Sequence, residues 1–215
     1  MKDWAAGGGT LIALGRAVSY LADPKIALLP ISQENLARVP DPAAKKQDAA
    51  PESAKPAAGS AAEPRVAGKL LASEEDYRKA IQADAELPDR ALGAIVRARI
   101  DGDHWLSAGL PPIINAVVQG TAIFTPAKLD KGVNVAVFLG PDQLFASGYL
   151  WEETRKQLAF KPLVVVKTEG RGSVIGFTAD PNFRAYLDGL NLLFLNAVFR
   201  GPAHARVGAS ESMPD

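Results

Sequence analysis

Two histidines and the complete absence of cysteine define the metal and nucleophile chemistry open to this 215-residue chain. Catalytic zinc needs three protein ligands and an open position for water. His104 is followed three residues later by Ser107 rather than by a carboxylate, and His204 stands in a polar segment near the end of the sequence. The sequence therefore predicts no metal site and no cofactor in this chain.

Nucleophilic catalysis is also disfavoured by the residue types. Without cysteine there is no thiolate nucleophile, no disulfide and no thiolate metal ligand. Ser19 lies a full turn into the helix expected after Gly15, with no histidine nearby in the sequence. No pair of base and nucleophile is predicted, and no residue is assigned a catalytic role.

Anion binding is the chemistry that remains. Open α/β sheets bind ligands in the crevice beyond the strand ends, and helix N-termini attract anions. Five residues follow expected strand ends and are the candidate ligand-binding set: Gly15, Arg16, Asp180, Asn182 and Arg184. The structural alternative is that Arg184 pairs with Asp180 or with a backbone carbonyl and fixes the corner between a strand and the final helix.

Paired carboxylates beside an aromatic residue, at Trp151-Glu152-Glu153, superficially suggest acid–base or sugar chemistry. Neighbouring helical residues point about 100° apart, so the two carboxylates do not share a target. The segment is better interpreted as a helix start with Trp151 packed under it. Glu152 and Lys156 are then spaced for a surface ion pair.

The elements that position these residues follow from apolar runs and alternation. Strands are expected at 10–14, 94–100, 117–124, 134–139, 163–168 and 173–178, and helices at 16–21, 73–85 and 182–199. The last two strands flank Glu169-Gly170-Arg171-Gly172, a hairpin signal in which glycine supplies a positive φ. The pattern predicts an α/β domain.

Composition and charge exclude several classes of partner. The 24 basic residues balance 24 acidic ones, so no net field attracts nucleic acid. No apolar stretch reaches the roughly 20 residues of a membrane span, and the start of the chain lacks the pattern of a signal peptide. Localisation stays open.

The organisation predicted along the chain has four parts. Residues 40–66 are rich in Ala, Pro, Lys, Glu, Ser and Gly and predict a low-complexity, disordered insertion. A partner-binding arm is the alternative there, although the charges are balanced and no aromatic anchor is present. Residues 1–39 and 67–200 are expected to form one domain, and 201–215 a flexible tail.

Four phrases, in order, carry a family resemblance: GGTLIALGRA, HWLSAGLP, SGYLWEETRKQLAFKPLVVVKTEGRGSVIGF and DPNFRAYLDGLNLLFLNAVF. They resemble the C-terminal region of bacterial zinc carboxypeptidases of the carboxypeptidase A type. In that family a peptidase domain precedes a class I glutamine-amidotransferase-like domain. The phrases extend, with gaps between them, from Gly8 to Phe199.

The resemblance implies a flavodoxin-like (class I glutamine-amidotransferase-like) sheet with helices on both faces, N-terminally truncated and with extra antiparallel strands. It also implies that a zinc-containing peptidase domain lies upstream of Met1 in a longer parent protein. The resemblance is compatible with a parent that is exported to the periplasm or the extracellular space. Active amidotransferases carry a cysteine on the sharp turn after a strand, whereas Leu14-Gly15-Arg16 has no thiol.

The expected function is therefore that of a non-catalytic accessory domain or fragment of a zinc metallocarboxypeptidase-like protein, whose parent removes C-terminal residues from peptides. The expected partners are the upstream peptidase domain or a second copy of the chain. The alternative is a small-molecule or anion-binding α/β module at the five candidate residues. An enzymatic role would have to recruit Asp180, Glu152 or Ser147, for which the sequence supplies no partner base.

Overall fold

The computed structural model describes residues 1–34, 91–120, 122–185 and 188–204. All of them belong to one unit, residues 1–38 and 88–215, and only this unit is considered below. The insertion expected at 40–66 and the helix expected at 73–85 lie outside the described residues.

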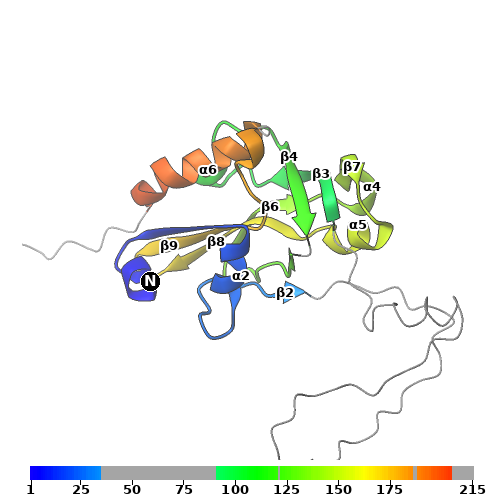
Figure 1. The fold of residues 1–215 in the computed structure, drawn as a ribbon. Helices are drawn as coiled ribbons and strands as arrows, with labels where there is room; N and C mark the ends of the chain where they lie inside the picture. The colour runs from blue at the N-terminus through cyan, green and yellow to red at the C-terminus, as the bar shows by residue number, and fades with distance from the viewer. Residues whose placement is uncertain (35–90, 121, 186–187, 205–215) are drawn as a thin grey trace, which may run out of the picture. The chain divides into compact units, whose positions relative to one another are not determined.

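A mixed sheet of seven strands organises the unit, in the order β1-β9-β8-β6-β3-β4 with β7 beside β3 (Figure 1). The strands are β1 (Thr10–Leu14), β3 (Ala91–Ile100), β4 (Ile113–Gly120), β6 (Val133–Phe138), β7 (Phe145–Tyr149), β8 (Pro162–Glu169) and β9 (Gly172–Phe177). Among these strands β1 and β9 run parallel, and the other pairings are antiparallel. The α/β class with extra antiparallel strands is confirmed; the parallel arrangement typical of a flavodoxin-like sheet is confined here to β1 and β9.

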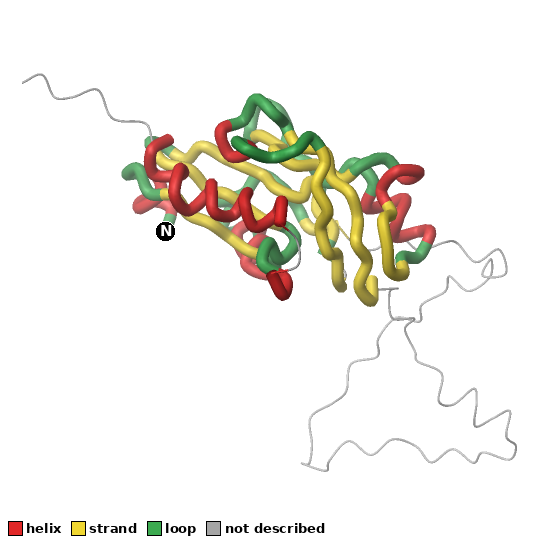
Figure 2. The backbone as a smooth tube through the Cα atoms, turned by 90° about the horizontal axis from the view of Figure 1, so that it is seen from above, coloured by secondary structure: helices red, strands yellow, loops and turns green. Residues whose placement is uncertain are grey.

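Helices lie on both faces of this sheet, as expected. They are α1 (Lys2–Ala6), α2 (Arg16–Ala22), α4 (Pro141–Leu144), α5 (Glu152–Leu158) and α6 (Asp188–Arg200), with short 3-10 helices η1 (Trp105–Ser107), η2 (Phe183–Ala185) and η3 (Gly201–His204). In Figure 1, α6 lies over one face and α2 against the other. Figure 2, seen from above, shows α6 in front of the strands.

Two hydrophobic clusters fill the space between these layers. Because successive side chains of a strand alternate between faces, Val164 of β8 joins the cluster under α6 while Val165 joins the cluster beside α2. The cluster under α6 contains Leu193 and Phe177. The ring of Phe177 meets that of Phe194 edge to face, with 6.2 Å between centroids. Burial on both faces fixes the register of the central strands.

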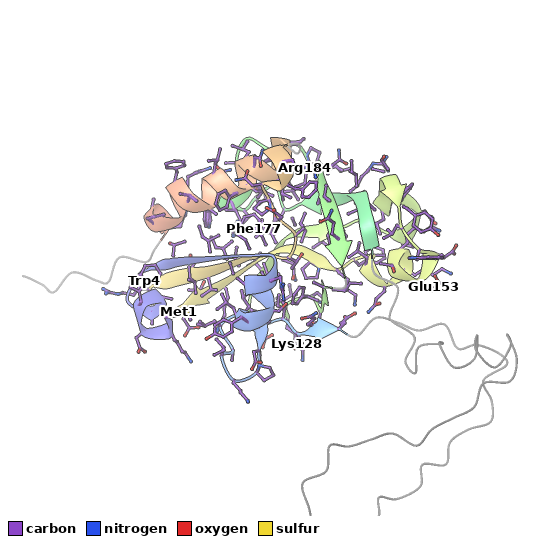
Figure 3. All side chains as sticks on the ribbon, viewed as in Figure 1. Met1, Trp4, Lys128, Glu153, Phe177 and Arg184 are labelled. Carbon is purple, nitrogen blue, oxygen red and sulfur yellow. The ribbon has the colours of Figure 1, made fainter. Side chains whose placement is uncertain are left out.

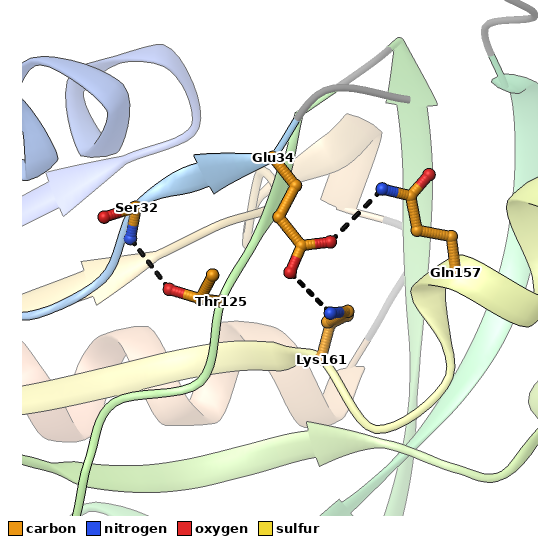
Figure 4. A network of polar contacts seen from close by, with 5 residues as sticks. All are labelled: Ser32, Glu34, Thr125, Gln157 and Lys161. Carbon is orange, nitrogen blue, oxygen red and sulfur yellow. Dashed lines mark hydrogen bonds and ion pairs between the residues drawn. The ribbon is translucent and has the colours of Figure 1, made fainter. Parts of the chain in front are cut away.

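A small second sheet ties the N-terminal segment to the rest of the unit. Strand β2 (Gln33–Glu34) pairs antiparallel with β5 (Ile123–Phe124). Ser32 donates its backbone N–H to Thr125 Oγ1 at 3.0 Å, and Glu34 accepts from Gln157 Nε2 at 3.2 Å and forms an ion pair with Lys161 (Figure 4). These contacts hold β2 against the end of α5.

The predicted strand over 117–124 is wrong in its bounds. Strand β4 ends at Gly120, which has a φ of 81°, and β5 begins only at Ile123. A positive φ at glycine bends the chain out of the extended conformation, so the apolar run is divided between two sheets. The strand β7 was not expected, because its residues are mostly exposed and lack an apolar pattern.

The expected β8–β9 hairpin is confirmed. Glu169 pairs with Gly172, and Gly170 between them has a φ of 59°. A Cβ atom on Gly170 would stand 2.6 Å from the carbonyl oxygen of Ala6, so both backbone conformation and space require glycine there.

The final helix begins later than predicted. Asp180 accepts a hydrogen bond from the backbone N–H of Asn182 at 2.9 Å, which closes a turn after β9. Arg184 then adopts a left-handed conformation, with φ 52° and ψ 25°, and α6 starts only at Asp188. The prediction that Arg184 stands in the first turn of this helix is wrong, because its backbone conformation is not that of a right-handed helix.

Candidate functional site

Four of the five predicted ligand-binding residues lie beyond the carboxyl ends of β1 and β9. The two strands end in register, Leu14 beside Phe177. Gly15 donates its N–H to the carbonyl of Phe177 at 2.8 Å, and with a φ of 50° it turns the chain into α2, which begins at Arg16. Asp180 and Asn182 follow Phe177, the last residue of β9, three and five positions later. The structure thus places Gly15, Arg16, Asp180 and Asn182 at the same end of the sheet, beyond the carboxyl ends of β1 and β9.

Arg184, labelled in Figure 3, is exposed and lies apart from the other four residues. Its guanidinium lies over the ring of Phe183, 5.5 Å from the centroid. The two line a hollow of about 390 Å³ with Gln119 and Ser147, over β3, β4 and β7. Gly15, Arg16, Asp180 and Asn182 are not part of its lining, so the five predicted residues do not form one pocket.

A second hollow, of about 350 Å³, lies at the opposite end of β9, where the strand begins. Its lining combines aromatic, cationic and hydroxyl side chains from four segments, including His104, Trp105, Lys131, Arg171, Ser173 and His204. The histidines, which sequence reasoning left without partners, therefore share one site. We call this hollow the histidine hollow below.

Trp105 stands between the two histidines. His204 stacks on the indole with 4.3 Å between ring centroids and 13° between planes, and His104 lies tilted at 5.3 Å. His104 Nδ1 accepts a hydrogen bond from the backbone N–H of Leu106 at 3.2 Å. Burial lowers the pKa of His104, as does the charge of His204, while Asp101 opposes the shift. A neutral His104 in this geometry carries its proton on Nε2.

Helix α6 brings the two histidines together. Asn196 in α6 donates from Nδ2 to the carbonyls of Leu106 and Ala108, at 2.8 and 2.9 Å. Arg200 donates to the carbonyl of Trp105 at 3.1 Å, and η3 then continues from Gly201 to His204. No local sequence signal joins these segments, because the contact depends on where the final helix docks.

Metal binding has no candidate cluster in residues 1–34, 91–120, 122–185 and 188–204. No group of three or more His, Cys, Asp or Glu side chains in these ranges is placed to hold a metal ion. Within the same ranges, no helix is long and apolar enough to cross a membrane.

The carboxylates after Trp151 are part of a helix start, as predicted. Helix α5 begins at Glu152, whose carboxylate pairs with Lys156 at 3.0 Å. The hydrogen bond from Lys156, followed by the charges of Lys156 and Arg155, lowers the pKa of Glu152. The expectation that Trp151 packs under the helix is wrong: its side chain is 40% exposed and meets Tyr149 edge to face at 5.1 Å.

The sheet edge formed by β1 is a candidate interaction surface. Of the strands that the structure describes, only β9 pairs with β1. Gly9 accepts from the N–H of Ser173 at 3.1 Å, and Gly15 donates to Phe177, so odd-numbered residues of this segment direct their backbone groups toward β9. By alternation, the N–H and C=O groups of Ile12 and Leu14 face the open side.

The composition of β1 is that of an internal strand. Natural edge strands are usually protected by charges, proline, bulges or shortness. The segment Thr10-Leu11-Ile12-Ala13-Leu14 has no charge and no proline, and its register with β9 runs without a shift from Thr10 to Leu14. Continuous apolar strands of this kind are typical of positions with a neighbour on each side.

Comparison with known proteins gives little additional information. No protein-family model matches the chain, and no curated protein matches it. A cytoplasmic protein from Salmonella typhimurium LT2 is similar in structure at 15% sequence identity and a TM-score of 0.37, over 94% of this chain. This chain spans 57% of that protein's length.

Proposed function

We propose that this chain is a non-catalytic accessory α/β domain of a larger zinc metallocarboxypeptidase-like protein, and that the edge of β1 pairs with a strand of that protein. The observation that carries the proposal is the edge of β1, a mainly apolar strand that pairs with β9 alone among the described strands. The proposal also draws on the resemblance of the phrases around Gly15, Trp151 and Phe183 to the C-terminal region of bacterial zinc carboxypeptidases.

Pairing along β1 is favoured by the backbone groups at Ile12 and Leu14. Unpaired N–H and C=O groups in a row are a template for another strand, and each hydrogen bond formed contributes about 0.5–1.5 kcal/mol. The helices α1 and α2 stand directly before and after β1, as in the crossover units of parallel sheets. A further strand beside β1 would therefore extend the parallel part of the sheet.

The chemistry in this proposal belongs to the upstream peptidase domain. That domain would hold the zinc ion and remove C-terminal residues from peptides, while this chain would support it or shape access of the substrate. The residues of this chain that take part are those of β1 and its flanking helices.

The experiment extends this chain by the sequence that the reading frame encodes upstream of Met1, which the proposal expects to be a peptidase domain, and compares this longer product with the shorter chain. Zinc content is measured for both by metal analysis, and release of C-terminal amino acids from a peptide is followed for both. We expect stoichiometric zinc and turnover in the longer product, and neither in the shorter chain. A longer reading frame that lacks a His-x-x-Glu pair and a later His, or peptidase turnover by the shorter chain with bound zinc, would overturn the proposal.

A further inference from the structure

We propose that the histidine hollow binds a small organic carboxylate. The hollow has the size of a small-ligand site, about 350 Å³. It lies at the end of β9 opposite to Gly15 and Arg16, so it is distinct from the anion crevice that the sequence predicted. This inference concerns a ligand of this chain alone and does not depend on the proposed accessory role.

The charge of the lining favours an anion. Lys131 and Arg171 contribute two positive charges to the lining, against the single carboxylate of Asp130. The whole chain has no net charge, so the excess of positive charge in the lining is specific to this site. A concave site with one sign of charge raises the local concentration of the opposite ion.

Hydrogen-bond donors surround the same space. Arg171 is held in place by a bond from its NH2 group to the carbonyl of Gly7 at 2.9 Å. A guanidinium carries five N–H donors, so this bond positions the group while it can still donate to a ligand. Three further residues of the lining, His104, Thr168 and Ser173, carry donor groups, which are the Nε2–H of a neutral imidazole and two hydroxyls.

Part of the lining is apolar, which favours an organic ligand over an inorganic ion. Trp105, Leu129, Val133 and Val166 contribute to the lining beside the cationic residues. Trp105 and Val166 form the more enclosed part of this apolar lining, since Leu129 is 95% exposed. An organic anion can contact both the cationic and the apolar side chains, whereas an inorganic ion gains only from the cationic ones.

Charge count separates a carboxylate from a phosphate ester. The excess of one positive charge in the lining matches a monoanion, and a phosphate monoester carries about −1.5 to −2 at neutral pH. Asp130 opposes the second negative charge. We therefore assign the site to carboxylates.

The test is isothermal titration of this chain with benzoate at low ionic strength and pH 7.5, with benzamide as the neutral analogue and inorganic phosphate as the competing anion. We expect one benzoate per chain, and binding of benzamide and of phosphate at least about tenfold weaker, because a hydrogen bond to a charged group is lost or a charge is mismatched.

Two matched pairs of variants locate the site. Arg171→Gln is expected to weaken benzoate binding about tenfold, whereas Arg16→Gln, at the opposite end of the strands, leaves it unchanged. Lys131→Gln is expected to weaken binding, whereas Lys128→Gln, in the same loop but outside the lining, does not. Thermal unfolding shows whether Arg171→Gln disturbs the β8–β9 hairpin. If it does, the comparison of Lys131→Gln with Lys128→Gln decides whether benzoate binds in the histidine hollow.

Three results would overturn the inference. They are the absence of saturable benzoate binding, phosphate or benzamide binding as tightly as benzoate, and benzoate binding that depends on Arg16 but not on Arg171 or Lys131.

Discussion

Two edge strands of the sheet, β4 and β1, are built differently. Strand β4, at one edge, alternates between buried and exposed positions, exposes Asn115 and Gln119, and ends at a glycine with positive φ, near which its register with β3 shifts. Strand β1, at another edge, is short, uncharged, apolar from Leu11 to Leu14, and in unbroken register with β9. One edge has the features that limit pairing with another chain, and the other lacks most of them.

This difference shows that a strand at the edge of a sheet does not always have the protective features that natural edge strands usually carry. The composition of β4 suits a strand with one solvated face, whereas that of β1 suits a strand between two neighbours. The contrast between the edges is what supports an accessory role for this chain.

The largest expected loss of stability comes from a substitution in β9, the strand that attaches β1 to the core. Phe177 is fully buried and pairs in register with Leu14. Phe177→Ala is expected to lower the free energy of unfolding by about 3–5 kcal/mol, measured by urea denaturation. The control is Phe199→Ala, at a side chain that is 77% exposed, with a change within about 0.5 kcal/mol. Equal effects of the two variants would show that the β9 side of the sheet is not part of the folded core.

A pair of proline substitutions distinguishes the two sides of β1. The N–H of Ala13 faces β9, so Ala13→Pro removes a bond of the ladder and is expected to cost about 1–3 kcal/mol more than Leu14→Pro, whose N–H faces the open side. Denaturant titration of both variants measures the difference. A greater loss for Leu14→Pro would contradict the direction assigned to the open edge.

The smallest expected effect compares lysine substitutions at the two edges. Ile113 on β4 and Leu14 on β1 are 48% and 37% exposed. In this chain alone, Ile113→Lys and Leu14→Lys are each expected to change the free energy of unfolding by less than about 1 kcal/mol. In the longer protein only Leu14→Lys should lower the thermal unfolding temperature, because a charge on a paired edge opposes strand addition. An equal shift for Ile113→Lys would remove the distinction between the edges.

Much of the fold was predictable from the sequence where local pattern and packing agree. The apolar run at 10–14, the alternation at 94–100 and the glycines after Glu169 each predicted an element that the structure contains. The start of the final helix was not predictable, because no local pattern marks the turn at Asp180 or the left-handed conformation of Arg184 that precede it. Strand β7 was missed since it carries no apolar period.

The candidate site was less predictable than the fold. The order of strands and helices predicted that Gly15 and Asp180 lie beyond the carboxyl ends of neighbouring strands. The stacking of His204 on Trp105 did not follow, because it depends on the docking of α6 onto η1 through Asn196. Contacts between distant segments leave no local pattern in a single sequence.

Hydrogen–deuterium exchange at the amides of β1 tests the accessory role most directly. In this chain alone, the amides of Leu11 and Ala13, which face β9, should exchange slowly, and those of Ile12 and Leu14 should exchange fast. In the longer in-frame product the account predicts that Ile12 and Leu14 become as protected as Ala13. Fast exchange at Ile12 and Leu14 in both proteins would contradict it.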